Sequence, residues 1–218
     1  MMRMVNRDEG RWDPSRSWTR RSVGLAAAAI VMWSSSAAIA DATATLTLDG
    51  LSFISFQDQE VLALPTGSTL EFQLGDANAD GSIPFTIDPG GLSIAPVDLP
   101  GGGGSLRYGL ASAASGTITP AAGGHIIQFN ANVTASMTGS DGHTGTYTYA
   151  MPFTTETAAA SDILGQVSVE RTGVRLVDGV WYAQIVAATT NRENAVPAPG
   201  TAVYSVLSGQ FDHLPIGQ

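Results

Sequence analysis

Five residues between positions 76 and 88 have the types and the spacing of a calcium-binding loop. Asp76, Asn78 and Asp80 alternate with alanines, and Gly81 follows them directly. Alternating carboxylate and amide oxygens can converge on one hard cation, and a glycine permits the sharp turn that this convergence requires. The sequence therefore predicts a calcium site whose ligands are Asp76, Asn78, Asp80, Ser82 and Asp88.

The order D-x-N-x-D-G resembles the first half of an EF-type calcium loop, as found in EF-hands, dockerins and thrombospondin-type calcium repeats. In that pattern Ser82 contributes its backbone carbonyl. The chain departs from the pattern at position twelve, where Ile87 replaces the bidentate acid and Asp88 follows one place later. Two alternatives stay open: a calcium loop between strands, with Asp88 reaching back, and an acidic Asx turn without metal.

Catalytic motifs are absent from the sequence. There is no G-x-S-x-G nucleophile elbow, and the three histidines that a zinc site would need are far apart at His125, His143 and His213. Three acids are candidates for a glycosidase pair, Glu156, Asp162 and Glu170, but nothing in their spacing selects two of them. The sequence therefore favours a non-enzymatic protein.

The first forty residues have the composition of a cleavable bacterial signal peptide. An arginine-rich segment precedes an apolar run at 23–33, and the small residues after it end in Ala38-Ile39-Ala40. This order is typical of a secretory signal cut after an A-x-A triplet. The apolar run is shorter than the roughly 20 residues that a membrane-spanning helix needs. We therefore expect a signal peptide at 1–40 and one mature domain at 41–218.

Two export routes remain open for this leader. Arg20-Arg21 before a mildly hydrophobic core resembles the twin-arginine signal that carries folded proteins, although Val23 replaces the usual aromatic or leucine residue. The alternative is an ordinary secretory signal with a basic start. The chain has no cysteine, so a lipoprotein anchor and disulfides are excluded. The destination is the periplasm, the cell surface or the medium.

The charge of the chain changes sign at the predicted cleavage site. The leader holds six of the ten basic residues and three of the nineteen acids. The rest therefore has four arginines against sixteen acids, a net charge of −12 compared with −9 for the whole chain. Such an acidic surface repels phosphate backbones, which excludes nucleic acid as a partner.

Strand patterns dominate the mature part. Apolar residues alternate with polar ones at 127–137, and again at 146–154, with a turn at Asp141-Gly142 between them. Period-two alternation indicates strands that bury one face, and Asp-Gly favours a hairpin turn. Further strands are expected at 43–48, 51–56, 61–64, 69–74 and 201–207, with a second hairpin at 174–186 that turns at Asp178-Gly179.

The segments 88–104 and 191–200 are rich in glycine, proline or polar residues and are expected to be loops, and 158–164 is a weak helix candidate. Short strands with tight turns predict an antiparallel β-sandwich, or alternatively a closed β-barrel.

Three functions fit this reading. The first is a non-enzymatic exported protein that binds a ligand or forms extracellular structure, stabilised by calcium if the loop binds it. The alternatives are a carrier of a small apolar ligand inside a barrel and a hydrolase on a β scaffold. A membrane barrel is weaker, because only two segments have its strand pattern. The mature part keeps one tryptophan, Trp181, so the exposed aromatic platforms that sugar binding uses are scarce.

Overall fold

The structure is a computed structural model that describes residues 42–56, 61–122, 124–156, 173–190 and 202–216. The predicted signal peptide, the helix candidate at 158–164 and the loop expected at 191–200 lie outside these residues. The described part is nearly all β, with 68% of residues in strands, which confirms the all-β prediction. Within the described ranges no helix is long and apolar enough to cross a membrane.

The described residues form fourteen strands and one short 3-10 turn. The strands of the first half are β1 (Ala42–Leu48), β2 (Phe53–Phe56), β3 (Val61–Ala63), β4 (Thr69–Leu74), β5 (Ile83–Ile87), β6 (Leu92–Ser93) and β7 (Val97–Leu99). After the 3-10 turn η1 (Pro100–Gly102) come β8 (Gly104–Leu110), β9 (Ala114–Ala121), β10 (Gly124–Gly139), β11 (Thr144–Thr154), β12 (Gly173–Val177), β13 (Val180–Thr190) and β14 (Ala202–Phe211).

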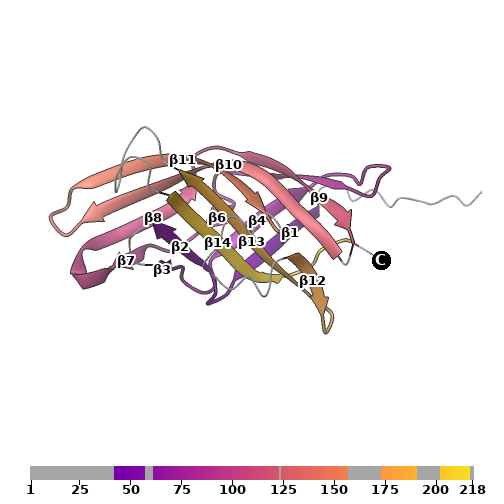
Figure 1. Cartoon of the computed structure of the whole chain (residues 1–218), viewed down its shortest axis with the longest axis horizontal. Helices are drawn as coiled ribbons and strands as arrows, with labels where there is room; N and C mark the ends of the chain where they lie inside the picture. The colour runs from indigo at the N-terminus through magenta and orange to yellow at the C-terminus, as the bar shows by residue number, and fades with distance from the viewer. Residues whose placement is uncertain (1–41, 57–60, 123, 157–172, 191–201, 217–218) are drawn as a thin grey trace, which may run out of the picture. The chain divides into compact units, whose positions relative to one another are not determined.

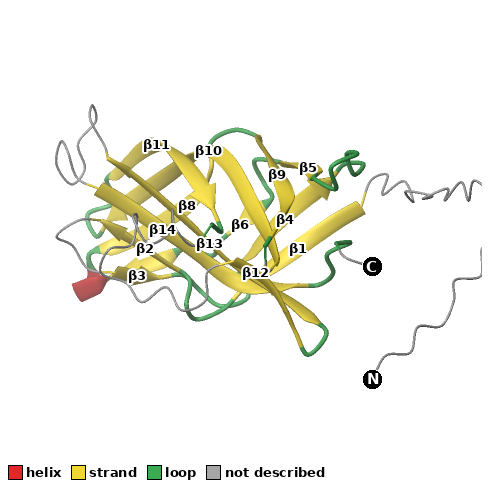
Figure 2. Ribbon diagram, turned by 45° about the vertical axis from the view of Figure 1, so that its right-hand side comes forward, coloured by secondary structure: helices red, strands yellow, loops and turns green. Residues whose placement is uncertain are grey.

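Eight of these strands close into an antiparallel ring (Figures 1 and 2). From β10 the hydrogen-bonded order is β9, β5, β4, β1, β14, β13 and β11, and β11 pairs again with β10. A ring has no free edge strand, whereas a sandwich consists of two separate sheets. The antiparallel prediction is confirmed, and of its two architectures the closed barrel is the one that forms.

The remaining described strands extend the ring. Long strands such as β10 and β14 each pair, along one edge, with one strand near their beginning and with another near their end. β10 pairs with β9 at one end and with β8 at the other. β14 pairs with β1 near its end and with β2 near its beginning. β12 forms a hairpin with β13 that projects from the barrel at Asp178-Gly179 (Figure 1).

Alternation along β10 and β11 sets the inside and the outside of the barrel. Ile127, Val133 and Ala135 are fully buried, whereas Gln128 and Asn130 between them are exposed. All eleven residues of β11 are in register with β10, and the hairpin turns at Gly142, whose φ is 83°. This agrees with the predicted hairpin.

The second predicted hairpin is also confirmed. Asp178 and Gly179 have φ values of 51° and 82°, the positive values that a tight turn between strands requires. β13 is buried on both faces from Ala183 to Ala187.

A chain of aromatic rings fills the barrel. The ring centroids of Phe211 and Phe72 are 5.5 Å apart, and those of Phe72 and Phe85 are 4.9 Å apart. The series continues through Phe129, 5.9 Å from Phe85, to Phe153, which stacks on Phe129 at 4.7 Å. Edge-to-face and offset contacts of this kind stabilise a core beyond the area that they bury.

The sequence missed three strands of this fold. β5, β8 and β9 contain Pro84, Gly109, Gly116 and Pro120, residue types that normally mark turns. The segment 88–104, expected to be a loop, contains the short strands β6 and β7 instead.

Candidate functional site

The register of β12, β13 and β14 aligns a row of residues across the outside of the barrel. Gly173 pairs with Gln184, and Gln184 pairs with Ser208. The row continues to Asp49, whose backbone amide donates to the Ser208 carbonyl at 2.8 Å. The row faces outward because its neighbours in sequence, Ala183 and Leu207 among them, belong to the barrel core.

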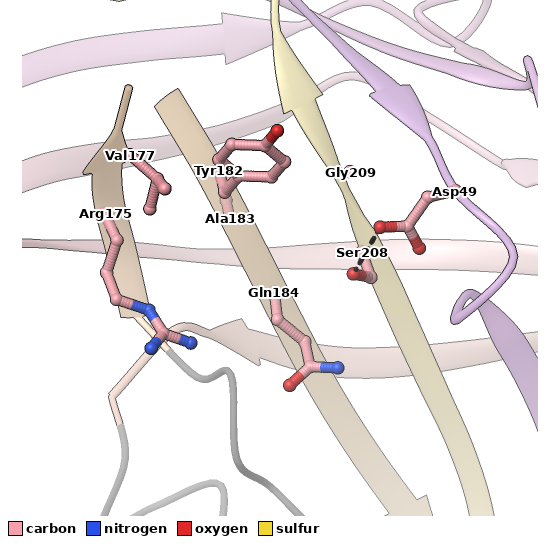
Figure 3. Close-up of a pocket in the computed structure, with 8 residues that line it drawn as sticks. All are labelled: Asp49, Arg175, Val177, Tyr182, Ala183, Gln184, Ser208 and Gly209. Carbon is pink, nitrogen blue, oxygen red and sulfur yellow. Dashed lines mark hydrogen bonds between the residues drawn. The ribbon is translucent and has the colours of Figure 1, made fainter. Parts of the chain in front are cut away.

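A pocket of about 310 Å³ lies over this row. Arg175 and Tyr182, a cross-strand pair in the next row, line the pocket beside Gln184. Figure 3 shows the complete lining, which is Asp49, Arg175, Val177, Tyr182, Ala183, Gln184, Ser208 and Gly209.

Gln184 is the unusual residue of this lining. Its side chain is only 8% exposed, yet its Oε1 atom has no hydrogen-bond partner among the described residues. A buried acceptor without a partner costs about 1–3 kcal/mol of stability. The atom has almost no accessible surface, so a rotation of the Gln184 amide is needed to present this acceptor to a ligand in the pocket.

The opposite wall of the pocket is held by a hydrogen-bond network. Ser208 Oγ donates to Asp49 Oδ2 at 3.2 Å (Figure 3), and the Leu51 amide donates to Asp49 Oδ1 at 2.9 Å. The buried hydroxyl of Ser52 accepts from the Ser208 amide at 2.9 Å and donates to the Ser208 carbonyl at 2.8 Å. These bonds fix the turn after β1 against β14 and orient Asp49 and Ser208.

Exposed apolar side chains occur next to the pocket. Val177, which lines it, is 49% exposed, and its neighbour Leu176 is 56% exposed. Leu51, which bonds to Asp49, is 45% exposed. The pocket therefore combines polar groups on its lining with apolar surface close by, the composition typical of ligand sites.

The serine of the pocket is paired with a carboxylate and not with a histidine. The Ser208 hydroxyl donates to Asp49, so the Ser–His pair of most serine hydrolases is not formed at this position. Across the described ranges no three His, Cys, Asp or Glu side chains gather into a group that could hold a metal. The Ser208–Asp49 pair belongs to the hydrogen-bond network that holds this wall of the pocket.

The histidines considered from the sequence lie at separate places. His125 contacts the ring of Trp181 at 6.0 Å, and burial lowers its pKa. The backbone amide of His143 donates to Asp141 in the β10–β11 turn, and His213 pairs with Asp212 at 3.2 Å. Of the acids considered for glycosidase chemistry, Glu156 accepts a bond from Gln128 at 3.4 Å. The other two lie outside the described residues.

The predicted calcium ligands are only partly brought together. Asp80 Oδ1 accepts from the backbone amide and the hydroxyl of Ser82, at 2.9 and 2.6 Å. Asn78 Nδ2 donates to the same hydroxyl at 2.9 Å, and Gly81 turns the chain with a φ of 80°. The Ser82 bonds lower the pKa of Asp80. These contacts are those of an Asx-type turn.

Asp76 and Asp88 stand apart from this group of bonds. Asp76 follows the end of β4 in the same loop, whereas the whole of β5 separates Asp88 from Ser82. Five residues of extended strand span roughly 16 Å, so Asp88 lies at the far end of β5. Calcium binding by this loop stays a prediction.

No motif in the sequence indicates the pocket. One usable signal was Gln184 itself, a polar residue inside the apolar run 180–186. Ser208 and Asp49 could not be found in that way, because only the pairing of distant strands brings them to Gln184.

The fold and the pocket define an eight-stranded antiparallel β-barrel with a pocket on its outer surface. Comparison with protein-family models, with curated proteins and with solved structures finds no match for this chain.

Proposed function

We propose that this protein is an exported, non-enzymatic binding protein that holds a small polar ligand on the outside of its barrel. The observation that carries the proposal is Gln184, which lines the pocket and whose buried Oε1 atom lacks a hydrogen-bond partner among the described residues. A ligand that donates a hydrogen bond to this atom removes the cost of its burial.

The filled interior favours this proposal over a carrier of apolar ligands. A carrier needs a cavity inside the barrel. Here Phe72 and Met151 are almost fully buried within the ring, and five phenylalanines contact one another in series across it. The barrel therefore serves as a rigid scaffold for a surface site.

Ser208 donates to Asp49 and not to a histidine, which favours binding over hydrolysis by a Ser–His pair. Export rests on the sequence alone. The basic segment, the apolar run and the A-x-A triplet of residues 1–40 support cleavage before Asp41. The periplasm, the cell surface and the medium are the compartments that such a leader serves.

Nuclear magnetic resonance titration of the mature chain tests the proposal. The probes are three classes of small molecule: neutral sugars, amino acids and dicarboxylates. We expect members of at least one class to shift the backbone amides of residues 173–184 and 208–209, and to raise the melting temperature. At about 100 times its Kd, a ligand adds about 2.7 kcal/mol to the stability of the protein. Shifts confined to other parts of the barrel, or none at all, would contradict the proposal.

A further inference from the structure

The pocket combines one unsatisfied neutral acceptor with two charged groups that already have partners. Asp49 accepts from the Leu51 amide and from the Ser208 hydroxyl, one bond to each carboxylate oxygen. Arg175 is likewise engaged in an interaction of its own. The group that still needs a partner is the Oε1 atom of Gln184. The ligand must therefore donate a hydrogen bond, but it does not need to carry a charge.

The charges around the pocket also disfavour ions of either sign. A cation is attracted by Asp49 but meets Arg175 in the same lining. An anion meets Asp49 and a chain with sixteen acids against four arginines after the predicted cleavage site. An uncharged ligand avoids both repulsions and the cost of removing a charge from water.

The rest of the lining suits the carbon face of a sugar ring. Tyr182 is half-buried, and its aromatic side chain lines the pocket together with Val177 and Ala183 (Figure 3). A sugar presents C–H groups on one face and hydroxyl groups at its edge. An aromatic ring with polar neighbours can contact both kinds of surface. Aromatic residues are scarce in this chain, but one of them lies at the site.

We propose that the pocket binds an uncharged, hydroxyl-rich ligand the size of one sugar unit, with its hydroxyls directed to Gln184 and its C–H face to Tyr182. The inference rests on the proposed function, because it assigns a ligand class to the same pocket. The volume of about 310 Å³ is near the lower end of the range for ligand pockets, about 300–1,000 Å³. That size favours a single unit over a longer chain.

Isothermal titration calorimetry of the mature chain provides the test. The neutral probes are glucose, galactose, mannose and N-acetylglucosamine, and the charged probes are glutamate, lysine and succinate, each at about 10 mM to reach millimolar Kd values. Gln184→Met removes the acceptor while keeping the shape of the side chain. Gln210→Met is the matched control, because Gln210 is on the same outward face of β14 but does not line the pocket.

We expect at least one neutral sugar to bind. Gln184→Met should weaken that binding by about tenfold or more, the effect of one lost hydrogen bond, and Gln210→Met by less than about twofold. Tyr182→Leu should weaken it by a similar factor, whereas Tyr182→Phe, which keeps the ring, should retain most of the affinity.

Three results would overturn the inference. If only charged probes bind, and their binding depends on Gln184, the sugar class is wrong while the pocket remains a binding site. If sugars bind equally well to Gln184→Met, the pocket is not their site. If no probe of either kind binds, both the ligand class and the proposed function fail.

Discussion

Gln184 is buried, but its side-chain oxygen has no hydrogen-bond partner among the described residues. Most buried polar atoms in proteins have partners, and the nearby Ser52 and Ser208 follow that rule by bonding to each other. The Oε1 atom of Gln184 has no partner among the described residues, although Gln184 is the direct cross-strand neighbour of Ser208. Two other buried side-chain atoms lack partners among the described residues, His125 Nδ1 and Ser205 Oγ, but of the three residues only Gln184 lines the pocket, which is why we propose that it serves a ligand.

The loop at 76–82 allows its two interpretations to be separated. Asp80→Asn keeps an oxygen that can accept from Ser82 but removes the charge that calcium would need. If the loop is an Asx turn, the melting temperatures of the wild type and the variant should both be unchanged by millimolar calcium. The Ser82 hydroxyl and amide, which both donate to Asp80 Oδ1, favour that outcome. A calcium-dependent rise in the wild type that Asp80→Asn abolishes would support the calcium site.

His125 should make stability depend on pH. Burial lowers its pKa below the ordinary value of 6.5, so the folded protein holds this side chain neutral where the unfolded chain has begun to bind a proton. The free energy of unfolding should therefore decrease as pH falls from 6.5 towards the lowered pKa. His125→Phe keeps a ring against Trp181 and should flatten that part of the curve. Urea denaturation at a series of pH values measures it, and an unchanged slope in the variant would argue against this assignment.

A sequence reveals residues of a site only where they are close together in the chain or stand out from their neighbours. The motif at 76–81 was recognised because its residues are adjacent in the chain. Gln184 was visible only as a polar residue in an apolar run. Asp49 and Ser208 are 159 positions apart, and no local pattern indicates that they meet.

At the scale of elements, period-two alternation predicted β4, β10 and β11 well, because each strand buries one face against the core. β5, β8 and β9 were missed since their prolines and glycines signal turns in isolation. In the barrel, Gly116 allows close packing. A Cβ on Gly116 would lie 2.3 Å from the carbonyl oxygen of Gln128 in the neighbouring strand.

A substitution at Gly209 tests how closely β14 packs against β1 where the two strands pair. A Cβ at this position would lie 2.1 Å from the carbonyl oxygen of Thr47, a backbone atom that cannot move aside cheaply. We expect Gly209→Ala to destabilise the protein by about 1–3 kcal/mol, the cost of overpacking a core. Gly109→Ala is the matched control, since a Cβ on that strand glycine meets nothing within 4 Å. Chemical denaturation measures the free energy of unfolding of both variants. Equal values would mean that the pairing of β14 with β1 tolerates a side chain at Gly209.

At the scale of the whole molecule, the sequence could define the class of fold but not its closure. Sandwich and barrel use the same alternating strands and the same hairpin turns. The difference arises from pairings such as β1 with β14 and β11 with β13, between segments that are distant in the sequence. Hydrophobic periodicity carries no information about such partners.

The leader makes a prediction about the whole chain. Expressed with its first forty residues in a bacterial host, the protein should be exported and recovered with Asp41 as its first residue, as intact-mass measurement would show. Replacing Arg20-Arg21 with two lysines should block export by the twin-arginine route and leave a general secretory route working. A cytoplasmic product that retains Met1 in the unaltered chain would contradict the export proposal.

The most direct test of the account is the stability of Gln184→Met without ligand. If Gln184 is held unsatisfied for a ligand, replacing it with an apolar side chain of similar shape should raise the free energy of unfolding by about 1–3 kcal/mol, while Gln210→Met leaves it nearly unchanged. Urea denaturation of the three proteins measures this. A loss of similar size in Gln184→Met would show that the amide makes structural hydrogen bonds, and would contradict the proposal that it serves a ligand.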